Sequence, residues 1–512
     1  MIRHSWMLVA VALPAAASGQ VVATAAPIVV SRIQVGTMKT THADSGGTDL
    51  AVSAATVEHL GIDRVTPVHR TSTATDQFWI WAGANLAPIN WVLGTLGLGL
   101  GLSLWETIIV LIVGNAIGAA LFALFCVMGQ RTGVNAMVLA RLTLGRRGAY
   151  VVAAVMVLMP MGWVGVNTWV VLDLAVAAID RLGINADTGP LRYVIAAVIL
   201  VIQVIITAWG FNAIRLFERW TMPVVLAVMV VMTVVSGFHV NGSFAPSSLS
   251  TADKLSAAST VMTAIGIGWG ITWFVYAADY TRFTRSEVST QRLFGVTFAG
   301  MFVPVVWLGI LGAYIASAGG GADPAQLVIA AFGALALPVL LLILHGPIAT
   351  NIVVMYSSVL AVLSLDLKAT QWKIAVGGGV VSAIVLWGFL HSASFANSAA
   401  AWMAALVVWI SPWAAITLID FFVLRRGSID PDLLYRAPSP RWADDVDWTA
   451  MACLVIGLVA GVLFMTTAIE GLQGPLAVAI GHIDLSWLVG SLAAGVPYYF
   501  LKRRRNPLPH NN

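Results

Sequence analysis

The chain has 512 residues, of which 59% are hydrophobic and only 10% are charged, and its mean hydropathy is +0.89. Water-soluble domains carry about 25% charged residues, so this composition excludes a chain whose surface is mainly exposed to water. The net charge of +4 excludes no class by itself, and two cysteines in apolar runs, Cys126 and Cys453, exclude a disulfide framework or a cysteine metal cluster. Lipid is therefore the solvent for most of the chain.

The first 77 residues come before the first predicted membrane span. Residues 1–37 have a basic start, an apolar stretch and small residues, as a secretory signal does. Cleavage there would insert the first span from the wrong side of the membrane, given the loop charges described below. We therefore interpret residues 1–37 as an extension before a true start at Met38, with a spanning or amphipathic segment over 6–30 as the alternative. Residues 38–77 are polar and predict a disordered cytoplasmic tail.

Twelve apolar runs are long enough to cross a bilayer core as helices of about 20 residues. They form one predicted membrane domain over residues 78–503, and a short cytoplasmic tail, 504–512, follows it. In chain order the predicted spans are 78–104, 107–130, 149–178, 193–214, 220–240, 255–278, 293–322, 324–365, 374–390, 392–424, 448–469 and 485–501.

The loops between these spans differ sharply in charge. Alternate loops, beginning with the one between the second and third spans, hold fifteen lysines and arginines, whereas the other loops hold three. Short loops rich in lysine and arginine stay in the cytoplasm. The bias predicts a multi-pass protein of the plasma (inner) membrane with both ends of the helix bundle in the cytoplasm.

Two of the spans contain clusters of residues that interrupt helices. The first span begins FWIWAGANLAPIN, and the sixth, which begins after five spans, contains TAIGIGWGITW. Interruptions at corresponding places in two halves are typical of secondary transporters that bind their substrate at the bilayer midplane. The spacing predicts a five-plus-five inverted repeat with two appended helices. The alternative is that these glycines only allow close helix packing, as we expect for Gly114 and Gly118 in the second span.

Polar side chains inside the spans also point to a binding site, because lipid penalises them unless they face a cavity or a partner. Trp163 and Asn167 lie four residues apart and share one face of the third span. In the eighth span, HGPIATNIVVMYSS, Pro347 frees carbonyl groups for a cation. Trp163, Trp269 of the sixth span and nearby asparagine amides suit a flat heterocycle, which would stack on indoles and pair with amides. Both tryptophans fall near mid-span, which argues against the alternative of interfacial anchors.

At these residues the chain resembles the nucleobase:cation symporter-1 family, within the LeuT-type fold. The resemblance runs from about residue 61 to the C-terminus and is carried by GIDRVTPVHRT with WAGANLAP, GQRTGVNAMVLARLTLGRRG, GWVGVNTW, AADYTRF and ATNIVVMYSS. It implies an all-α integral membrane transporter of about twelve helices. Its implied activity is import of a nucleobase or related heterocycle (cytosine, purine, uracil, allantoin, hydantoin or thiamine type) by proton or sodium symport through alternating access.

The resemblance also implies which residues hold the substrate. The ring would lie between an aromatic side chain of the third span, which maps to Trp163, and one of the sixth, which maps to Trp269 with Trp273 as the alternative register. A further asparagine of some relatives falls at Met355, so that contact is absent here. The implied substrate-binding residues are Trp163, Asn167, Gly268, Trp269, Gly270 and Asn351.

A cation site is implied by the same resemblance, at the positions Ala84, Ala87, Gly346, Ala349 and Thr350. Ala349 stands where sodium-coupled relatives carry a hydroxyl group, and the loss of one hard oxygen ligand weakens a sodium site. This favours proton coupling, with His345 and Asp173 as candidates, although His345 is equally explained as a neutral hydrogen-bonded residue. We expect no cofactor, and no metal other than a coupling Na⁺.

Asp279 and Arg282, three residues apart beyond the sixth span, predict either a structural salt bridge or a cytoplasmic gate. The sequence contains no HExxH motif, Walker loop or paired carboxylates inside the spans, so we expect no enzyme, and the polar rings of a channel are also absent. The alternative within transporters is an amino-acid:cation symporter of the same fold. The expected partners are a small heterocycle and the bilayer, without nucleic acid; the oligomeric state is open, and a monomer would suffice.

Overall fold

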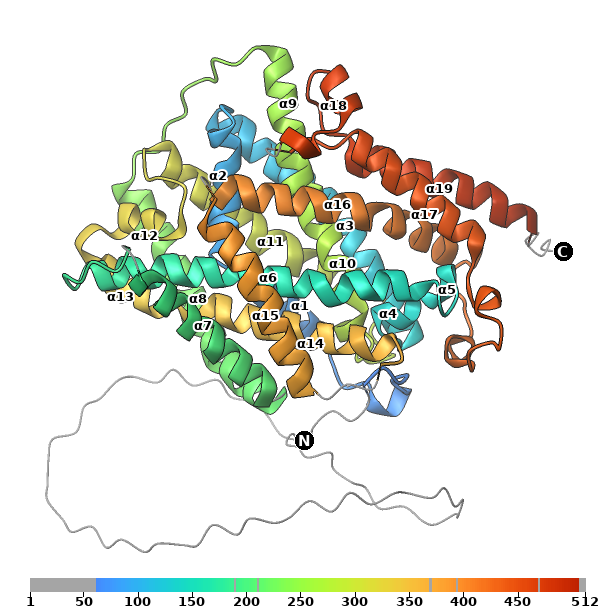
Figure 1. Cartoon of the computed structure of the whole chain (residues 1–512). Helices are drawn as coiled ribbons and strands as arrows, with labels where there is room; N and C mark the ends of the chain where they lie inside the picture. Colours follow the sequence, from blue (N-terminus) through green and yellow to red (C-terminus); the bar gives the residue numbers. More distant parts are fainter. Residues whose placement is uncertain are drawn as a thin grey trace, which may run out of the picture. The chain divides into compact units, whose positions relative to one another are not determined.

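The computed structural model describes residues 61–187, 190–209, 211–367, 371–392, 395–467 and 470–505, and these residues form helices joined by loops (Figure 1). The predictions for residues 1–60 and 506–512 lie outside the described residues. The helices of the first half are α1 (Ala74–Asn85), α2 (Ile89–Gly99), α3 (Leu104–Thr132), α4 (Ala136–Leu139), α5 (Arg141–Leu144), α6 (Ala149–Asp180), α7 (Pro190–Trp209) and α8 (Phe211–His239). Those of the second half are α9 (Thr251–Val261), α10 (Ile267–Thr281), α11 (Thr290–Ser317), α12 (Pro324–Phe332), α13 (Ala336–Ile343), α14 (His345–Ser364), α15 (Gln371–Leu390), α16 (Phe395–Leu418), α17 (Trp448–Leu463), α18 (Pro475–Ala479) and α19 (Ser486–Arg505).

The predicted interruption of the first span is confirmed. Helix α1 ends at Asn85 and α2 begins at Ile89, because Pro88 has no N–H to donate and disfavours helical geometry at the residue before it. The start of the span differs from the prediction. A capping box between Thr73 and Asp76 begins α1 at Ala74, four residues before the predicted boundary.

The sixth span is interrupted in a different way from the one we expected. It remains helical throughout, but between α9 and α10 it widens into a π-helical turn over Met262–Gly266. A Cβ atom at Gly268 would lie 1.9 Å from the carbonyl oxygen of Thr263, so only glycine fits against this turn. The glycine cluster therefore produces a π-bulge, a feature that is frequent at functional sites, rather than an unwound segment.

The prediction of a single helical span over 324–365 is wrong. It forms α12, a short turn at Gly333–Leu335, α13 and α14. The chain turns at Gly333, whose φ of +53° is readily adopted by glycine. Seven helices among the described residues are long and apolar enough to cross a membrane by themselves, so the count of twelve spans stays a prediction.

Several helices carry an apolar face that no other part of the described chain covers. On α7, Val194, Val198 and Val201 recur at helical spacing and are each more than half exposed. By contrast, every residue from Thr263 to Asp279 is buried, so the π-turn and most of α10 lie in the interior. Exposed apolar stripes around a buried central helix are what a bundle with lipid as its solvent presents.

The helices pack into two groups, with the candidate site between them. The first group contains α1, α2, α3, α10 and α11, and the second contains α6, α7, α8, α14 and α15. Helix α16 packs on α10, while α17 and α19 lie side by side at one edge (red in Figure 1). Because α10 belongs to one group and α6 to the other, the residues on their facing sides meet in the middle of the protein.

Close backbone contact joins α3 to the sixth span, and the packing role expected for Gly114 and Gly118 is confirmed. A Cβ atom at Gly114 would lie 2.7 Å from the Cα atom of Gly266, and one at Gly270 would lie 2.1 Å from the carbonyl carbon of Gly118. Only glycine lets two helix backbones come this close. Gly270 thus belongs to the packing interface with α3.

We expect Gly270→Ala to force α3 and α10 apart and to destabilise the protein by about 1–3 kcal/mol, the usual cost of overpacking. Thermal unfolding of the purified protein in detergent would measure the loss. Gly295→Ala on α11 is the matched control, because a Cβ atom there would have no neighbour within 4 Å. Equal melting temperatures for the two variants would contradict the close packing.

Part of the predicted N-terminal tail is ordered, so the prediction of disorder up to residue 77 is wrong for residues 61–77. The main chain of Val65 donates to the carbonyl of Gly133 (2.8 Å), and Arg70 donates to the carbonyl of Gln130 (2.7 Å). Arg282 donates to the carbonyl of Gly61 (2.9 Å). The polar composition suggested disorder, but these polar groups are hydrogen-bonded to the arginine-rich end of the bundle, defined as the end that carries Arg131, Arg141, Arg146, Arg282 and Arg425.

At this same end, an acidic residue ties the end of α14 to the start of α6. Asp366 accepts three hydrogen bonds from Arg146, two of them of 3.0 Å, and one from Tyr150. Partial burial opposes its charged form, but the hydrogen bonds from Tyr150 and Arg146 and the positive charges of Arg146 and Arg141 outweigh that effect. The pKa of Asp366 is therefore lowered.

Because the pKa of Asp366 is lower in the folded chain than in the unfolded one, its charge stabilises the protein above about pH 4 and ceases to do so as the pH falls through the folded pKa. We expect Asp366→Asn to lower the melting temperature at pH 7, and the difference from wild type to shrink below about pH 4. Asparagine tolerates the φ of +58° at this position, so the change removes charge without adding strain. Asp444→Asn, at an exposed acid in a neighbouring loop, should leave the melting temperature unchanged.

Candidate functional site

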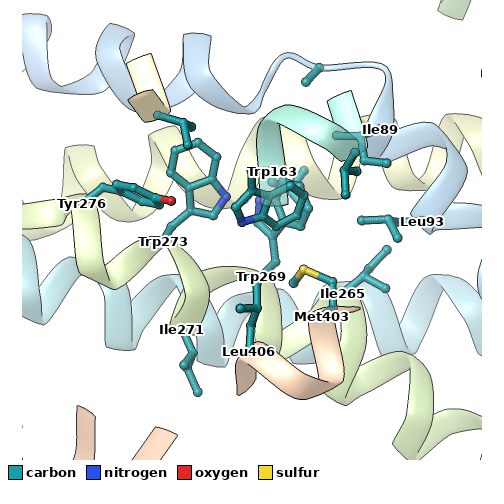
Figure 2. Close-up of a cluster of buried hydrophobic side chains, with 14 of the residues drawn as sticks. Ile89, Leu93, Trp163, Ile265, Trp269, Ile271, Trp273, Tyr276, Met403 and Leu406 are labelled. Atoms are coloured by element: carbon teal, nitrogen blue, oxygen red, sulfur yellow. The ribbon is translucent and has the colours of Figure 1, made fainter. Parts of the chain in front are cut away.

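A small internal cavity of about 10 Å³ lies where the two helix groups meet. The break in the first span, α6, α10 and α14 each contribute to its wall. Figure 2 shows the side chain of Trp163 close to those of Trp269, Trp273 and Tyr276, and all four line this cavity. The lining residues are Ala84, Ala87, Ile89, Trp163, Asn167, Trp269, Trp273, Tyr276, Thr350 and Val354.

The aromatic side chains are close together but do not enclose an open slot. The rings of Trp163 and Trp269 have centroids 5.6 Å apart and an interplanar angle of 78°, an edge-to-face contact. Trp273 lies 6.3 Å from Trp269, so both candidates for the second aromatic position face the same cavity. A space of this size holds about one water molecule. For a planar ring to enter, the indoles must change from edge-to-face to more parallel orientations.

Asn85 connects the break of the first span to the sixth span. Its amide oxygen accepts a hydrogen bond of 2.7 Å from the indole N–H of Trp269, and its amide nitrogen donates to the carbonyl of Trp81 at 2.8 Å. Across the break, Asn90 donates to the carbonyl of Asn85 at 2.7 Å. Asn85 is fully buried. This asparagine thereby fixes the orientation of the Trp269 ring relative to the end of α1.

A second group of buried amide side chains is joined to Asn167 by hydrogen bonds, on the side away from the cavity. Asn167 donates to the side-chain oxygen of Asn351 at 2.9 Å, and Asn351 donates to the side-chain oxygen of Gln203 at 3.0 Å. Thr168 donates to the same oxygen of Gln203 at 2.9 Å. The network joins α6, α7 and α14 and presents the Asn167 side of α6 to the cavity. Asn351 is therefore one step removed from the cavity that Asn167 lines.

The predicted cation positions are divided between the cavity and its surroundings. Ala84 and Ala87, at the break, and Thr350, on α14, all line the cavity. The hydroxyl of Thr350 donates to the carbonyl of Gly346 at 3.4 Å. The side chains of Ala349 and His345 lie outside the part of the chain that the structure describes. The two spans expected to share a cation are thus brought together at the break.

Three other predicted residues, Gly268, Gly270 and Asp173, have contacts away from the cavity. Gly268 fits against the π-turn and Gly270 against α3, and neither is among the lining residues of the cavity, so a direct substrate contact stays a prediction for both. A helix turns about 100° per residue, which places the neighbours of Trp269 on other faces. Asp173 accepts a 2.8 Å hydrogen bond from the main chain of Ala325 and so caps the start of α12.

The predicted gate pair takes part in closing the arginine-rich end. Asp279 accepts a 3.0 Å hydrogen bond from the main chain of Ala136 in α4. Arg282 donates to the main-chain carbonyls of Asp279, Gly61 and Asp63. These bonds attach both the loop between α3 and α6 and the ordered N-terminal segment to the end of α10. The pair therefore lies at a junction of three segments.

A larger cavity of about 360 Å³ opens toward the opposite end of the bundle. It lies between the end of α2, α9 with its π-turn, the first half of α16 and the loops that flank α18. Asp484, buried in its wall, accepts hydrogen bonds from Thr263 (3.1 Å) and from the main chain of Thr466 (2.7 Å). Burial raises the pKa of Asp484. The cavity reaches the π-turn and so approaches the centre from that end.

The structure adds site residues that the sequence did not single out. Asn85 stands within the quoted first-span motif, but its hydrogen bond to Trp269 depends on two segments far apart in the chain. Gln203 lies in an otherwise ordinary apolar helix, and its intramembrane polarity was the only available signal. Tyr276 follows Trp269 and Trp273 at helical spacing, which would have placed it on the same face.

The chain matches, over residues 64–490, the family described as permease for cytosine/purines, uracil, thiamine, allantoin. It is 24% identical over 460 residues to the putative purine-cytosine permease YxlA of Bacillus subtilis, covering 88% of this chain and 96% of that protein. It is 26% identical to the purine-cytosine permease fcyB of Emericella nidulans, covering 72% of this chain and 74% of that protein.

The fold is similar to that of Mhp1, a nucleobase-cation-symport-1 family transporter. The TM-score is 0.67 to its inward-facing structure, at 19% identity, over 88% of this chain and 95% of Mhp1. It is 0.65 to its closed structure with bromovinylhydantoin bound, at 20% identity, over 88% of this chain and 97% of Mhp1. The family match covers most of the chain, and the solved structures share its all-α integral membrane fold. The chain therefore belongs to the cytosine/purine permease family, that is, the nucleobase:cation symporter-1 family, and is a transporter and not an enzyme.

Proposed function

We propose that this protein imports a nucleobase or a related flat heterocycle across the plasma membrane, coupled to entry of H⁺ or Na⁺. The observation that carries the proposal is the meeting of Trp163, Trp269 and Asn167 at the break of the first span, between two separately packed helix groups. Indole faces stack on planar rings, and an amide can both donate and accept hydrogen bonds at a ring edge. The family match argues against the amino-acid carrier considered from the sequence.

Transport would proceed by relative movement of the two helix groups about this site. The loop charges support a cytoplasmic position for the arginine-rich end, which residues 61–77 and the contacts of Arg282 cover. The cavity of about 360 Å³ then provides the approach from outside. Substrate entering from there would separate the Trp163 and Trp269 rings. Release to the cytoplasm would require the hydrogen bonds of the N-terminal segment to Gln130, Gly133 and Arg282 to break.

The coupling ion would act where Ala84, Ala87 and Thr350 approach one another. Carbonyl groups freed at a helix break are hard oxygen ligands that suit Na⁺. The alanine at position 349 removes one hydroxyl from that set, so we propose H⁺ as the coupling ion. An ion that orders the break also orders the site, and therefore ion and substrate binding favour each other.

Competition of radiolabelled cytosine uptake tests the proposal. Cells of a bacterial host that lacks its own cytosine uptake would express the protein and be challenged with purines, uracil, allantoin and thiamine, with and without sodium and with a protonophore. We expect saturable uptake that a subset of these compounds blocks. Sensitivity to the protonophore without sodium dependence supports proton coupling, and the reverse pattern supports sodium. Absence of saturable uptake for every heterocycle would refute the proposed function.

A further inference from the structure

We propose that the hydroxyl group of Tyr276 is a specificity-determining contact that forms a hydrogen bond with a polar edge group of the bound heterocycle. This inference rests on the proposed function and deepens it. None of the sequence motifs pointed to this residue as a ligand of the substrate. The position of Tyr276, its burial and its lack of a hydrogen-bond partner support this role.

Tyr276 lies on the wall of the central cavity. Trp269, Trp273 and Tyr276 are spaced by four and three residues, which places them on one face of α10. All three line the central cavity, together with Trp163 from α6. The rings of Trp273 and Tyr276 are in contact, with centroids 5.4 Å apart. In Figure 2 the hydroxyl end of Tyr276 points toward the indoles and not away from them.

Burial makes the hydroxyl costly unless it has a partner. Tyr276 is only 2% exposed, and among the described residues no donor or acceptor reaches its oxygen. A buried tyrosine hydroxyl usually finds a hydrogen-bond partner, and leaving it without one costs free energy.

Three other polar groups that line the cavity have hydrogen-bond partners within the protein. The indole N–H of Trp269 is paired with Asn85, the amide of Asn167 with Asn351, and the hydroxyl of Thr350 with Gly346. Tyr276 thus has a polar atom without a partner, whereas each of these three groups has at least one hydrogen bond within the protein. A molecule that fills the cavity would supply the missing partner.

The chemistry of a phenol limits what that molecule presents. The hydroxyl can donate to a carbonyl or ring nitrogen, and it can accept from a ring N–H or an exocyclic amine. A heterocycle stacked on the indoles would therefore meet Tyr276 with its edge and not with its face. Together with Asn167 on α6, this predicts a preference for rings that carry hydrogen-bonding groups on more than one edge, as oxo- and amino-substituted pyrimidines and purines do.

Uptake by the Tyr276→Phe variant tests the inference, because phenylalanine keeps the ring and removes only the hydroxyl. We expect the KM for cytosine to rise about tenfold with little change in maximal rate, because the substrate loses one hydrogen bond in a buried site. Tyr314→Phe is the matched control, since its hydroxyl donates to the carbonyl of Val240 (2.7 Å) and lies away from the cavity. An unchanged KM in Tyr276→Phe would overturn the inference.

Two cytosine analogues sharpen the test, one without the 2-oxo group and one without the 4-amino group. If Tyr276 binds one of these groups, the analogue that lacks it should inhibit wild type and the variant equally well, while cytosine discriminates between them. Such non-additivity is the signature of a direct contact. Strictly additive losses for both analogues would exclude both substituents as the partner and assign the contact to a ring nitrogen or ring N–H.

Thermal unfolding of the substrate-free protein separates recognition from a purely structural role. Removing a hydroxyl that has no partner should leave the melting temperature of Tyr276→Phe equal to or above that of wild type. A clear decrease would show that the hydroxyl is already bonded within the protein and would overturn the inference. Failure of the proposed function is distinct, because wild type would then show no saturable heterocycle uptake at all.

Discussion

Replacing Trp163 with alanine is expected to weaken heterocycle binding by about 1–3 kcal/mol, the usual contribution of one base–aromatic stack. This corresponds to an increase in the dissociation constant of roughly 5- to 150-fold, since each 1.4 kcal/mol is a factor of ten. Trp163 is buried at the cavity and its ring meets that of Trp269 edge to face, so the variant loses one wall of the site. The measurement is KM for labelled cytosine, or direct binding to the purified protein.

Trp105→Ala is the matched control for this loss. Trp105 lies in the first turn of α3 with 58% of its surface exposed, as an interfacial anchor would. Its removal should leave KM unchanged, even if expression decreases slightly. Unaltered uptake by Trp163→Ala in cells with normal amounts of the protein would exclude stacking on this indole.

Replacing Asn85 with alanine is expected to impair transport as strongly, although Asn85 is not among the residues that line the cavity. The change leaves the indole N–H of Trp269 buried without an acceptor, which costs about 1–3 kcal/mol. It also removes the direct side-chain link between the break of the first span and the sixth span. We expect a lower melting temperature and a higher KM together, because the Trp269 ring is no longer held in one orientation.

Asn115→Ala isolates the contribution of that link. Both asparagines are buried, and each donates at 2.8 Å to the carbonyl four residues earlier, Trp81 for Asn85 and Leu111 for Asn115. Among the hydrogen bonds described, only that of Asn85 extends to Trp269. The control should therefore show the loss of the shared intrahelical bond without the rise in KM. Equal KM values for the two variants would contradict a role for Asn85 in holding the ring.

Much of the fold could be predicted because lipid imposes a simple rule on the sequence. Long apolar runs must form helices, which gave the positions of α3, α6 and α11. The glycine, asparagine and proline clustered around position 88 predicted the break before α2, whereas Pro160 and Pro304 lie inside unbroken helices. The π-turn could not be predicted in the same way. Three glycines permit unwinding, bulging or close packing equally well, and the choice depends on how near α3 approaches. The run over 324–365 was misjudged because apolar composition alone does not reveal a turn at Gly333.

Some residues of the candidate site could be predicted from the sequence, and others could not. Trp163, Asn167 and Trp269 were identifiable because aromatic and amide side chains at mid-span are rare and costly in lipid. Asn85 and Gln203 owe their roles to partners that are far away in the sequence, Trp269 and Asn351, so spacing along the chain carries no information about them. Tyr276 required knowledge of a missing partner, which only three-dimensional contacts provide.

The glycine contacts between α3 and the sixth span also constrain how the protein moves. Where Gly114 meets Gly266 and Gly118 meets Gly270, no side chains separate the two backbones, so there are no rotamers to rearrange as one helix shifts past the other. Any sliding would drive main-chain atoms into one another. We therefore expect the two helices to move together as one rigid unit. The flexibility needed to expose the site first to one side of the membrane and then to the other must come from the ends of these two helices and from the helices packed against them.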